Sequence, residues 1–285
     1  MKLSIPPLLY DLLRNRRFLV GLSLFLAVVL FGLIGGYVYA RNPFDMSRAP
    51  EQPPSPEYPL GTDRLGRDIL AQLIHGTRNS LYVGILTALI AMPIGLVVGT
   101  TAGAKGGLVD EALMRFTDVV LTIPGVLVAI IAAATLPAGM RTYETVALIL
   151  GALSWPWFAR AIRAQLLSLK EREFIYMSRL AGYSDLRLAF EDMLPNIATY
   201  IFMAFVLFVN GGILGEAALS LIGVGPARGV TLGTILYWAT QMEAVRRGLW
   251  WWFASAGAMI VLATSSLMIV TTAVDEVFNP RLRRV

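Results

Sequence analysis

The sequence has no cysteine and a single histidine, His75, among its 285 residues. Without cysteine there are no disulfide scaffolds, thiolate zinc sites, iron–sulfur clusters or cysteine nucleophiles, and one histidine excludes sites built from several imidazoles. Charge is also scarce, because only 15% of the residues are Asp, Glu, Lys or Arg, against about 25% in an ordinary soluble domain. No Gly-x-x-x-x-Gly-Lys-Ser/Thr loop occurs, so the chain has no phosphate loop of its own for ATP. We expect no catalytic residues, no metal site and no bound cofactor.

Apolar residues are correspondingly abundant. They make up 56% of the chain, and the mean hydropathy is +0.65. Disorder and an ordinary soluble enzyme both fit this composition poorly. The sequence therefore predicts one polytopic membrane domain over residues 1–285.

Six stretches are long and apolar enough to cross a bilayer, which takes about 20 residues each. They cover residues 18–40, 81–103, 113–136, 143–164, 197–221 and 252–274. We therefore expect an all-α membrane protein with a first span at 18–40, an extracytoplasmic loop at 41–80 and a five-span core at 81–275. Pro93 and Pro124 are expected to kink their spans, as membrane helices tolerate.

The distribution of basic residues predicts the orientation. With the N-terminus in the cytoplasm, the inner segments hold 15 of the 24 Lys and Arg residues and the outer segments hold nine. Cytoplasmic loops carry such an excess, so both termini are predicted to be cytoplasmic. The net charge of +5 is then a topological signal, and nucleic acid is not an expected partner.

The first span has a competing interpretation as a cleaved signal peptide. Basic residues precede it, and Val38-Tyr39-Ala40 resembles a cleavage site with small residues. Its apolar run is longer than the 7–15 residues of a typical signal core, which favours an uncleaved span.

The outer loop has two parts of different character. Residues 42–56 are rich in proline and should be extended. Residues 68–75 have apolar side chains at helical spacing, and we expect this segment to lie along the outer face of the membrane. His75 lies there alone, as a structural or solvated histidine.

The inner loop at 165–196 combines mixed charges with more apolar side chains than a solvated loop needs. A first helix is predicted to end at Gly182, and Ser184 or Asp185 should cap a second short helix. Pro195 stops that helix or opens the fifth span. The loop is either an amphipathic segment on the lipid headgroups or a docking element for a cytoplasmic protein.

A family resemblance rests on this loop and on the outer loop. Gly182, followed after nine residues by Asp192-Met193-Leu194-Pro195, has the spacing of the EAA loop of ABC importer permeases. The stretch Gly61-Thr62-Asp63-Arg64-Leu65-Gly66-Arg67-Asp68 resembles the first outer loop of the C-type permease subunits of oligopeptide and dipeptide importers. The resemblance extends from about residue 10 to 284. Two departures stand out: Tyr176-Met177-Ser178 replaces Glu-Ala-Ala, and Asp192 replaces the usual Ile.

The resemblance implies a type I importer permease in the inner membrane of a prokaryote. It implies three kinds of partner besides the lipid bilayer: a second homologous permease, two cytoplasmic subunits that bind ATP and Mg²⁺, and an extracytoplasmic solute-binding protein. It implies peptides as the solute, with oligosaccharides or metal chelates as alternatives. The residues assigned to the ATPase-coupling loop are Tyr176, Met177, Ser178, Arg179, Gly182, Tyr183, Ser184, Asp185, Leu186, Leu194 and Pro195.

Asp118 and Glu216 are the two ionisable residues placed inside spans, and such residues are candidate functional sites. For Asp118 the simpler interpretation is a structural ion pair with Arg115, three residues earlier. Glu216 is expected to be structural, to face the pore or to face a partner subunit. A secondary transporter would need charged groups at span centres, where none lie, and a channel would not need the large inner loop.

Overall fold

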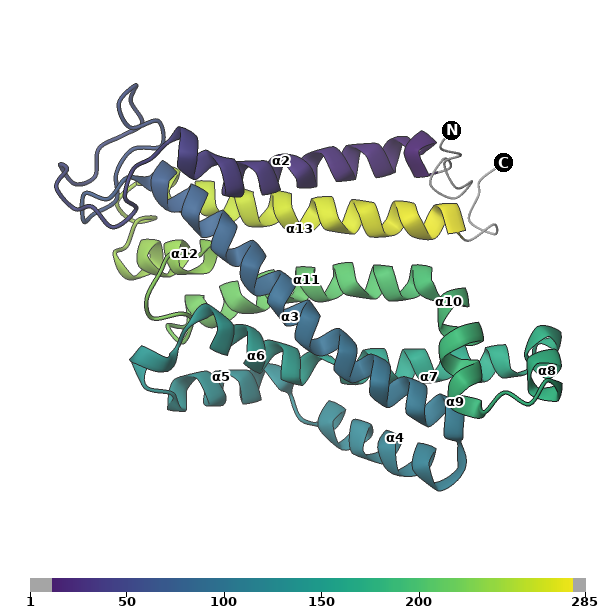
Figure 1. Cartoon of the computed structure of the whole chain (residues 1–285). Coiled ribbons are helices and arrows are strands. Elements are labelled where there is room, and N and C mark those ends of the chain that lie inside the picture. Colours follow the sequence, from purple (N-terminus) through teal and green to yellow (C-terminus); the bar gives the residue numbers. More distant parts are fainter. Residues whose placement is uncertain (1–11, 279–285) are drawn as a thin grey trace.

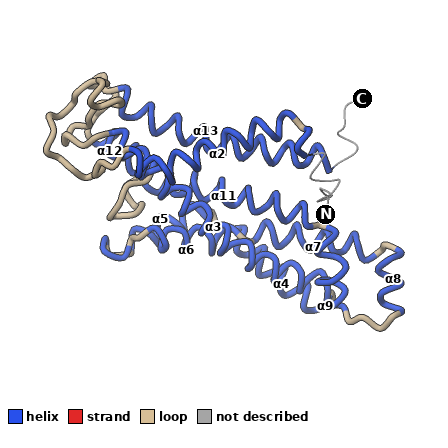
Figure 2. Tube along the Cα trace, turned by 45° about the horizontal axis from the view of Figure 1, so that its top comes forward, coloured by secondary structure: helices blue, strands red, loops and turns tan. Residues whose placement is uncertain are grey.

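The computed structural model describes residues 12–278, and nearly all of its regular structure is helical (Figures 1 and 2). Within these residues there is no strand, only an isolated antiparallel bridge between Thr62 and Asp68. The all-α prediction is confirmed. The longer helices are α2 (Arg16–Val38), α3 (Ile69–Lys105), α4 (Gly107–Thr122), α5 (Gly125–Thr135), α6 (Tyr143–Ser154), α7 (Pro156–Lys170), α11 (Ala198–Leu221), α12 (Leu232–Gln241) and α13 (Trp250–Phe278).

Four of these helices are individually long and apolar enough to cross a membrane: α2, α3, α11 and α13. Two bent pairs complete a set of up to six spans, namely α4 with α5, at an angle of 74°, and α6 with α7, at 42°. Pro124 stands directly before α5, and Pro156 opens α7. A proline has no N–H to donate to the preceding turn, so each break lies where the helical ladder would lose a bond. Pro93, in contrast, lies inside α3, which continues through it.

Helix α3 begins twelve residues before the predicted second span. The Asp68 carboxylate accepts a hydrogen bond from the Ala71 N–H at 3.1 Å and caps the helix at Ile69. Ile69 and Leu73 are buried among residues of α12 and α13. The expectation that residues 68–75 lie along the outer membrane surface was therefore wrong: they form the first turns of a helix that continues through the apolar run.

Helix α3 crosses the middle of the bundle and packs against α2, α6, α7 and α11 (Figure 1). Its close approach to α7 requires a small residue at Gly99, where a Cβ atom would lie 2.4 Å from the carbonyl oxygen of Ala159. Van der Waals packing between small residues is a main source of helix association in membranes. The two helices thus form one rigid unit.

The loop between α2 and α3 is held by buried polar residues. Asp63 is completely buried and accepts hydrogen bonds from the Arg67 Nε at 2.6 Å and the Gln72 Nε2 at 3.0 Å. Asp68 accepts from the Tyr39 hydroxyl at 2.7 Å and from the Arg41 Nη1 at 3.0 Å. Asp63 and Asp68, which belong to the stretch that resembles the permease family, therefore fix this loop to the start of α3. This loop and α12 lie at one end of the molecule, and α8 lies at the other (Figure 1).

Candidate functional site: the loop between α7 and α11

The chain between α7 and α11 folds into a compact projection made of four short helical segments. They are α8 (Glu173–Leu180), α9 (Asp185–Arg187), the π-helical turn η2 (Leu188–Met193) and α10 (Leu194–Asn196). The last residue of α7, Lys170, donates from Nζ to the carbonyl oxygen of Ala104 at 2.7 Å. The projection is therefore attached to the ends of both α7 and α3.

Gly182 ends the first helix of the projection, as predicted. Its φ angle is +86°, a left-handed conformation that glycine adopts without a Cβ penalty. The Tyr183 N–H then bonds back to the carbonyl oxygen of Ser178 at 3.3 Å, a typical helix C-terminal arrangement. A Cβ atom at Gly182 would meet nothing within 4 Å. The glycine is required by the backbone conformation and not by crowding.

The second helical segment is capped by Ser184, which resolves the choice between Ser184 and Asp185. The Ser184 hydroxyl accepts from the Arg187 N–H at 3.4 Å. Asp185 instead forms an exposed ion pair with Arg179 at 3.3 Å, which joins the two sides of the Gly182 turn. The Arg187 guanidinium lies 4.0 Å from the centre of the Tyr183 ring, and the hydrogen bond that it donates to Glu191 raises the pKa of Arg187.

One face of the projection is buried and anchors it to the bundle. Ile175, Leu188, Met193 and Leu194 are each less than one tenth exposed and belong to the main apolar core. Leu194 is thus an anchoring residue of the loop, whereas Pro195 beside it is exposed.

The exposed part of the projection carries large apolar side chains, and we call it the coupling surface after the role that the sequence predicts for this loop. It is formed by Phe174, Tyr176, Met177, Leu180, Leu186 and Phe190, of which Leu180 is 78% exposed. Arg179 and Asp185 are also exposed, while Ser178 and Tyr183 are partly buried. An apolar patch rimmed by charges is typical of a protein-interaction site.

Asp118 forms an ion pair with a different arginine from the one predicted. The Arg160 side chain on α7 donates to Asp118 Oδ1 on α4, with Nε at 2.9 Å. Arg115 pairs with Glu111 on its own helix, so the expected Arg115–Asp118 pair was wrong. Asp118 faces α7 across the helix interface, and the sequence separation of 42 residues hides this contact from any local pattern.

Glu216 lies in the interior of this chain and has no exposed surface. Its carboxylate accepts hydrogen bonds from the Ser220 hydroxyl at 2.5 Å, the Thr231 hydroxyl at 2.6 Å and the Ser80 hydroxyl at 3.3 Å. Thr231 caps α12, and Ser80 also accepts from the Leu232 N–H at 3.0 Å. Glu216 therefore ties α11, α3 and the start of α12 together.

A comparison of the sequence with known protein families identifies the family of this chain. Residues 77–284 match the family described as binding-protein-dependent transport system inner membrane component. The chain belongs to this family.

Individual relatives of the permease carry transport names. It is 33% identical over 232 residues to the dipeptide transport system permease protein DppC of Haemophilus influenzae, covering 78% of this chain and 77% of that protein. It is 32% identical over 224 residues to the oligopeptide transport system permease protein OppC of Bacillus subtilis, covering 78% and 72%. It is 37% identical over 186 residues to the glutathione transport system permease protein GsiD of Pectobacterium atrosepticum, covering 65% and 60%. The family recognised from the loop motifs is thereby confirmed.

Three polar features of the permease escaped the sequence interpretation. Arg163 on α7 pairs with Asp110 on α4, next to the Arg160–Asp118 pair. The positions of Arg160 and Arg163, one helical turn apart, are a signal that could have been used. Arg78 is the second feature. The sequence interpretation assigned it to an outer loop, because the predicted second span began at residue 81 whereas α3 begins at Ile69.

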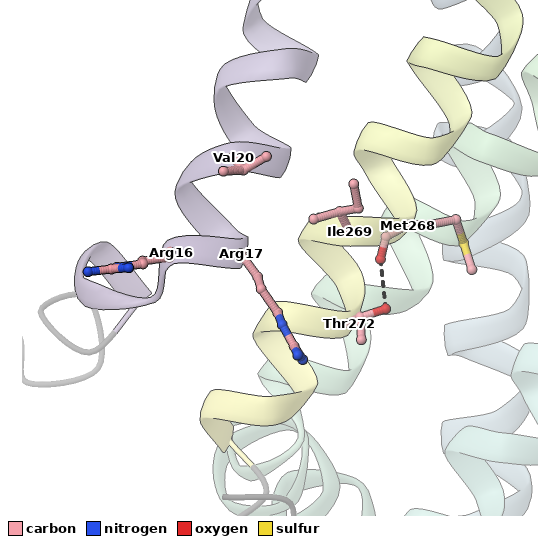
Figure 3. Close-up of a pocket in the computed structure, with 6 residues that line it drawn as sticks. All are labelled: Arg16, Arg17, Val20, Met268, Ile269 and Thr272. Carbon is pink, nitrogen blue, oxygen red and sulfur yellow. Dashed lines mark hydrogen bonds between the residues drawn. The ribbon is translucent and has the colours of Figure 1, made fainter. Parts of the chain in front are cut away.

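A third feature is a groove between α2 and α13 (Figure 3). It is lined by Arg16, Arg17, Val20, Met268, Ile269 and Thr272. Arg17 reaches toward α13 and bonds Glu276 at 3.3 Å, while Arg16 points away from that helix (Figure 3). The Arg17–Glu276 pair joins α2 to α13 near the start of the first and the end of the second. Among the described residues, no group of three His, Asp or Glu side chains could hold a metal ion.

Proposed function

We propose that this permease subunit imports peptides across a prokaryotic cell membrane, driven by ATP hydrolysis in separate cytoplasmic subunits. The dipeptide, oligopeptide and glutathione names of its relatives support peptides as the solute. The exposed coupling surface is the observation that supports ATPase docking, because a solvated loop does not need six large apolar side chains that are 41–78% exposed.

In this proposal the projection faces the cytoplasm and transmits force to the spans. Its buried face is part of the main core, and Lys170 ties its base to the end of α3. A push on the coupling surface would move α7 and α3 as a unit, since Gly99 lets the two helices pack closely. Rigid-body movement of such a unit against a second, homologous permease would alternate the access of the translocation path. A solute-binding protein would deliver the peptide at the opposite end.

The decisive experiment reconstitutes the whole transporter with two variants. Leu180→Asp places a charge at the centre of the coupling surface, and Arg179→Glu replaces its ion pair with Asp185 by a repulsion. Both should lower peptide uptake and uncouple ATPase activity from it. Val245→Asp, at a residue that is 71% exposed in the segment after α12, is the control for folding and assembly, measured as the yield of intact complex, because the solute-binding protein would dock at that end.

Two results would contradict the proposal. Unchanged uptake and ATPase stimulation in both loop variants would exclude the coupling role. Uptake of oligosaccharides or metal chelates, with no uptake of peptides, would exclude peptides as the solute. Purification in mild detergent adds an independent check, because a channel or a secondary transporter would not bring a second permease and ATPase subunits with it.

A further inference from the structure

Arg78 is a cation at the edge of the apolar part of helix α3. It lies within α3, directly before residues 79–104, which contain no charged side chain. Its side chain is exposed, and it forms no ion pair or hydrogen bond with any residue in the part of the chain that the structure describes. Basic side chains beside the apolar part of a membrane helix commonly reach to the membrane surface, and one that also borders a pocket is a candidate binding group.

Arg78 borders a pocket of about 440 Å³ between α2, α3 and α6. Val29 and Leu33 of α2 form one wall, and Tyr82 of α3 and Tyr143 of α6 form another. The volume lies within the roughly 300–1,000 Å³ of pockets that bind small molecules, which are typically apolar with a few polar groups. The pocket therefore suits a small ligand with an apolar body.

A carboxylate lies next to one of the residues that line the pocket. The Tyr82 hydroxyl, which lines the pocket, donates to Glu144 Oε1 at 3.1 Å. Glu144 is exposed and, like Arg78, has no ion-pair partner within residues 12–278. The pocket thus has a cation at its border, apolar walls, and a carboxylate one hydrogen bond beyond Tyr82, and neither charge has an ion-pair partner within residues 12–278.

We propose that this pocket binds the zwitterionic peptide during translocation, with the peptide carboxylate at Arg78 and the peptide ammonium group at Glu144. This inference rests on the proposed function and names the groups that would recognise the solute inside the permease. A guanidinium matches a carboxylate through paired N–H donors, and an ammonium group bonds readily to a carboxylate.

The pair of opposite charges distinguishes a peptide from other anions. A lipid phosphate or an acidic side chain of a partner permease would satisfy Arg78 and leave Glu144 without a cation. A peptide satisfies both groups and places its side chains on Val29, Leu33 and the two tyrosines. The argument therefore depends on the terminal charges of the solute, and these can be removed chemically.

The test uses the assembled transporter in nanodiscs, without the solute-binding protein, and measures binding by saturation-transfer difference NMR. The probes are a dileucine peptide, its C-terminal amide and its N-acetyl derivative. The wild type should bind the unmodified peptide about tenfold more tightly than either derivative. This is the loss of affinity expected when one hydrogen bond to a charged group is removed. Arg78→Gln should abolish the preference over the amide only, and Glu144→Gln the preference over the N-acetyl derivative only.

Controls separate charge recognition from folding. Arg78→Lys and Glu144→Asp keep the charges and should keep both preferences. Arg246→Gln, at an exposed arginine in the segment that follows α12, should change neither.

Equal binding of all three probes to the wild type would overturn the inference, as would unchanged preferences in Arg78→Gln and Glu144→Gln. Loss of the second permease from the Arg78→Gln complex, with the wild-type preferences retained, would assign Arg78 to the subunit interface instead. Peptide uptake by the wild type without any terminal preference would refute this site and leave the proposed function intact. Absence of both peptide binding and peptide uptake would refute the proposed function itself.

Discussion

Arg163 and Asp110 form a two-point ion pair between α7 and α4, with Nε–Oδ1 at 2.5 Å and Nη2–Oδ2 at 2.6 Å. The neighbouring Arg160–Asp118 pair joins the same two helices one to two turns further along. Thr117 is the only buried residue of α4, so ion pairs contribute much of the interaction that holds α4 against α7. Because α7 leads directly into α8, the ion pairs connect the coupling surface to the α4–α5 bend.

Asp110→Asn should loosen α4 from α7. Asp110 and Arg163 are 14% and 34% exposed, so the pair is partly desolvated, and its loss should cost about 2 kcal/mol, as for a hydrogen bond to a charged group. Thermal unfolding of the detergent-solubilised complex measures the loss, and the double variant Asp110→Arg with Arg163→Asp should recover part of it. Arg115→Gln is the control, because its exposed pair with Glu111 contributes at most about 0.5 kcal/mol. Equal effects of Asp110→Asn and Arg115→Gln would show that the interhelical pair does not stabilise α4.

Gly182→Ala should affect coupling more than stability. The new methyl group meets no atom within 4 Å, so the only cost is that of the left-handed backbone, about 1–2 kcal/mol. This strain should shift the Gly182 turn and reduce the amount of solute transported per ATP hydrolysed. Gly107→Ala is the matched control, since Gly107 also has a positive φ, of +55°, and open space but lies at the start of α4. The same loss of transport per ATP in both variants would contradict a specific role for the Gly182 turn.

Glu216→Ala should release the start of α12 from α11. The substitution leaves the hydroxyls of Ser80, Ser220 and Thr231 without their acceptor in a buried environment. A buried donor that loses its acceptor costs about 1–3 kcal/mol, which thermal unfolding should detect. Hydrogen exchange should also increase at the first turn of α12. Glu243→Ala, at an exposed glutamate, serves as the reference, and protection of α12 equal to the wild type in Glu216→Ala would exclude the anchoring role.

Stability should fall at alkaline pH because of Tyr39. Burial and the hydrogen bond to Asp68 raise the pKa of the Tyr39 hydroxyl from 10.0 to about 12. The folded protein therefore favours the protonated phenol, and this contribution is complete below pH 10 and is lost as the pH rises to about 12. Unfolding temperatures of the wild type and Tyr39→Phe should differ at pH 8–9 and converge between pH 10 and 12. A constant difference over that range would show that Tyr39 does not titrate in this way.

Features set by neighbouring residues were predictable from the sequence. The helix end at Gly182 and the cap at Ser184 follow from short-range backbone rules, and both residues take those roles in the structure. Helix content likewise follows from long apolar runs. The start of α3 was missed because Ile69 to Ala71 belong to a buried helical turn whose burial is supplied by α12 and α13, far along the chain.

Contacts between residues far apart in the sequence could not be predicted from it. Asp118 was expected to pair with its near neighbour Arg115, yet the rotation of α4 against α7 places Arg160 within hydrogen-bond distance. Glu216 had three open interpretations until the fold placed hydroxyls from α3 and the start of α12 around it.

Hydropathy, helix caps and loop motifs are properties of residues close together in the chain, so an all-helical membrane permease could be predicted from them. The packing of the helices shows which charges are paired, which are buried, and which, like Arg78 and Glu144, have no ion-pair partner within residues 12–278. The physical reason is that a polar contact depends on the relative rotation and depth of two helices. The packing of all the helices together sets both quantities, and no local pattern encodes either one.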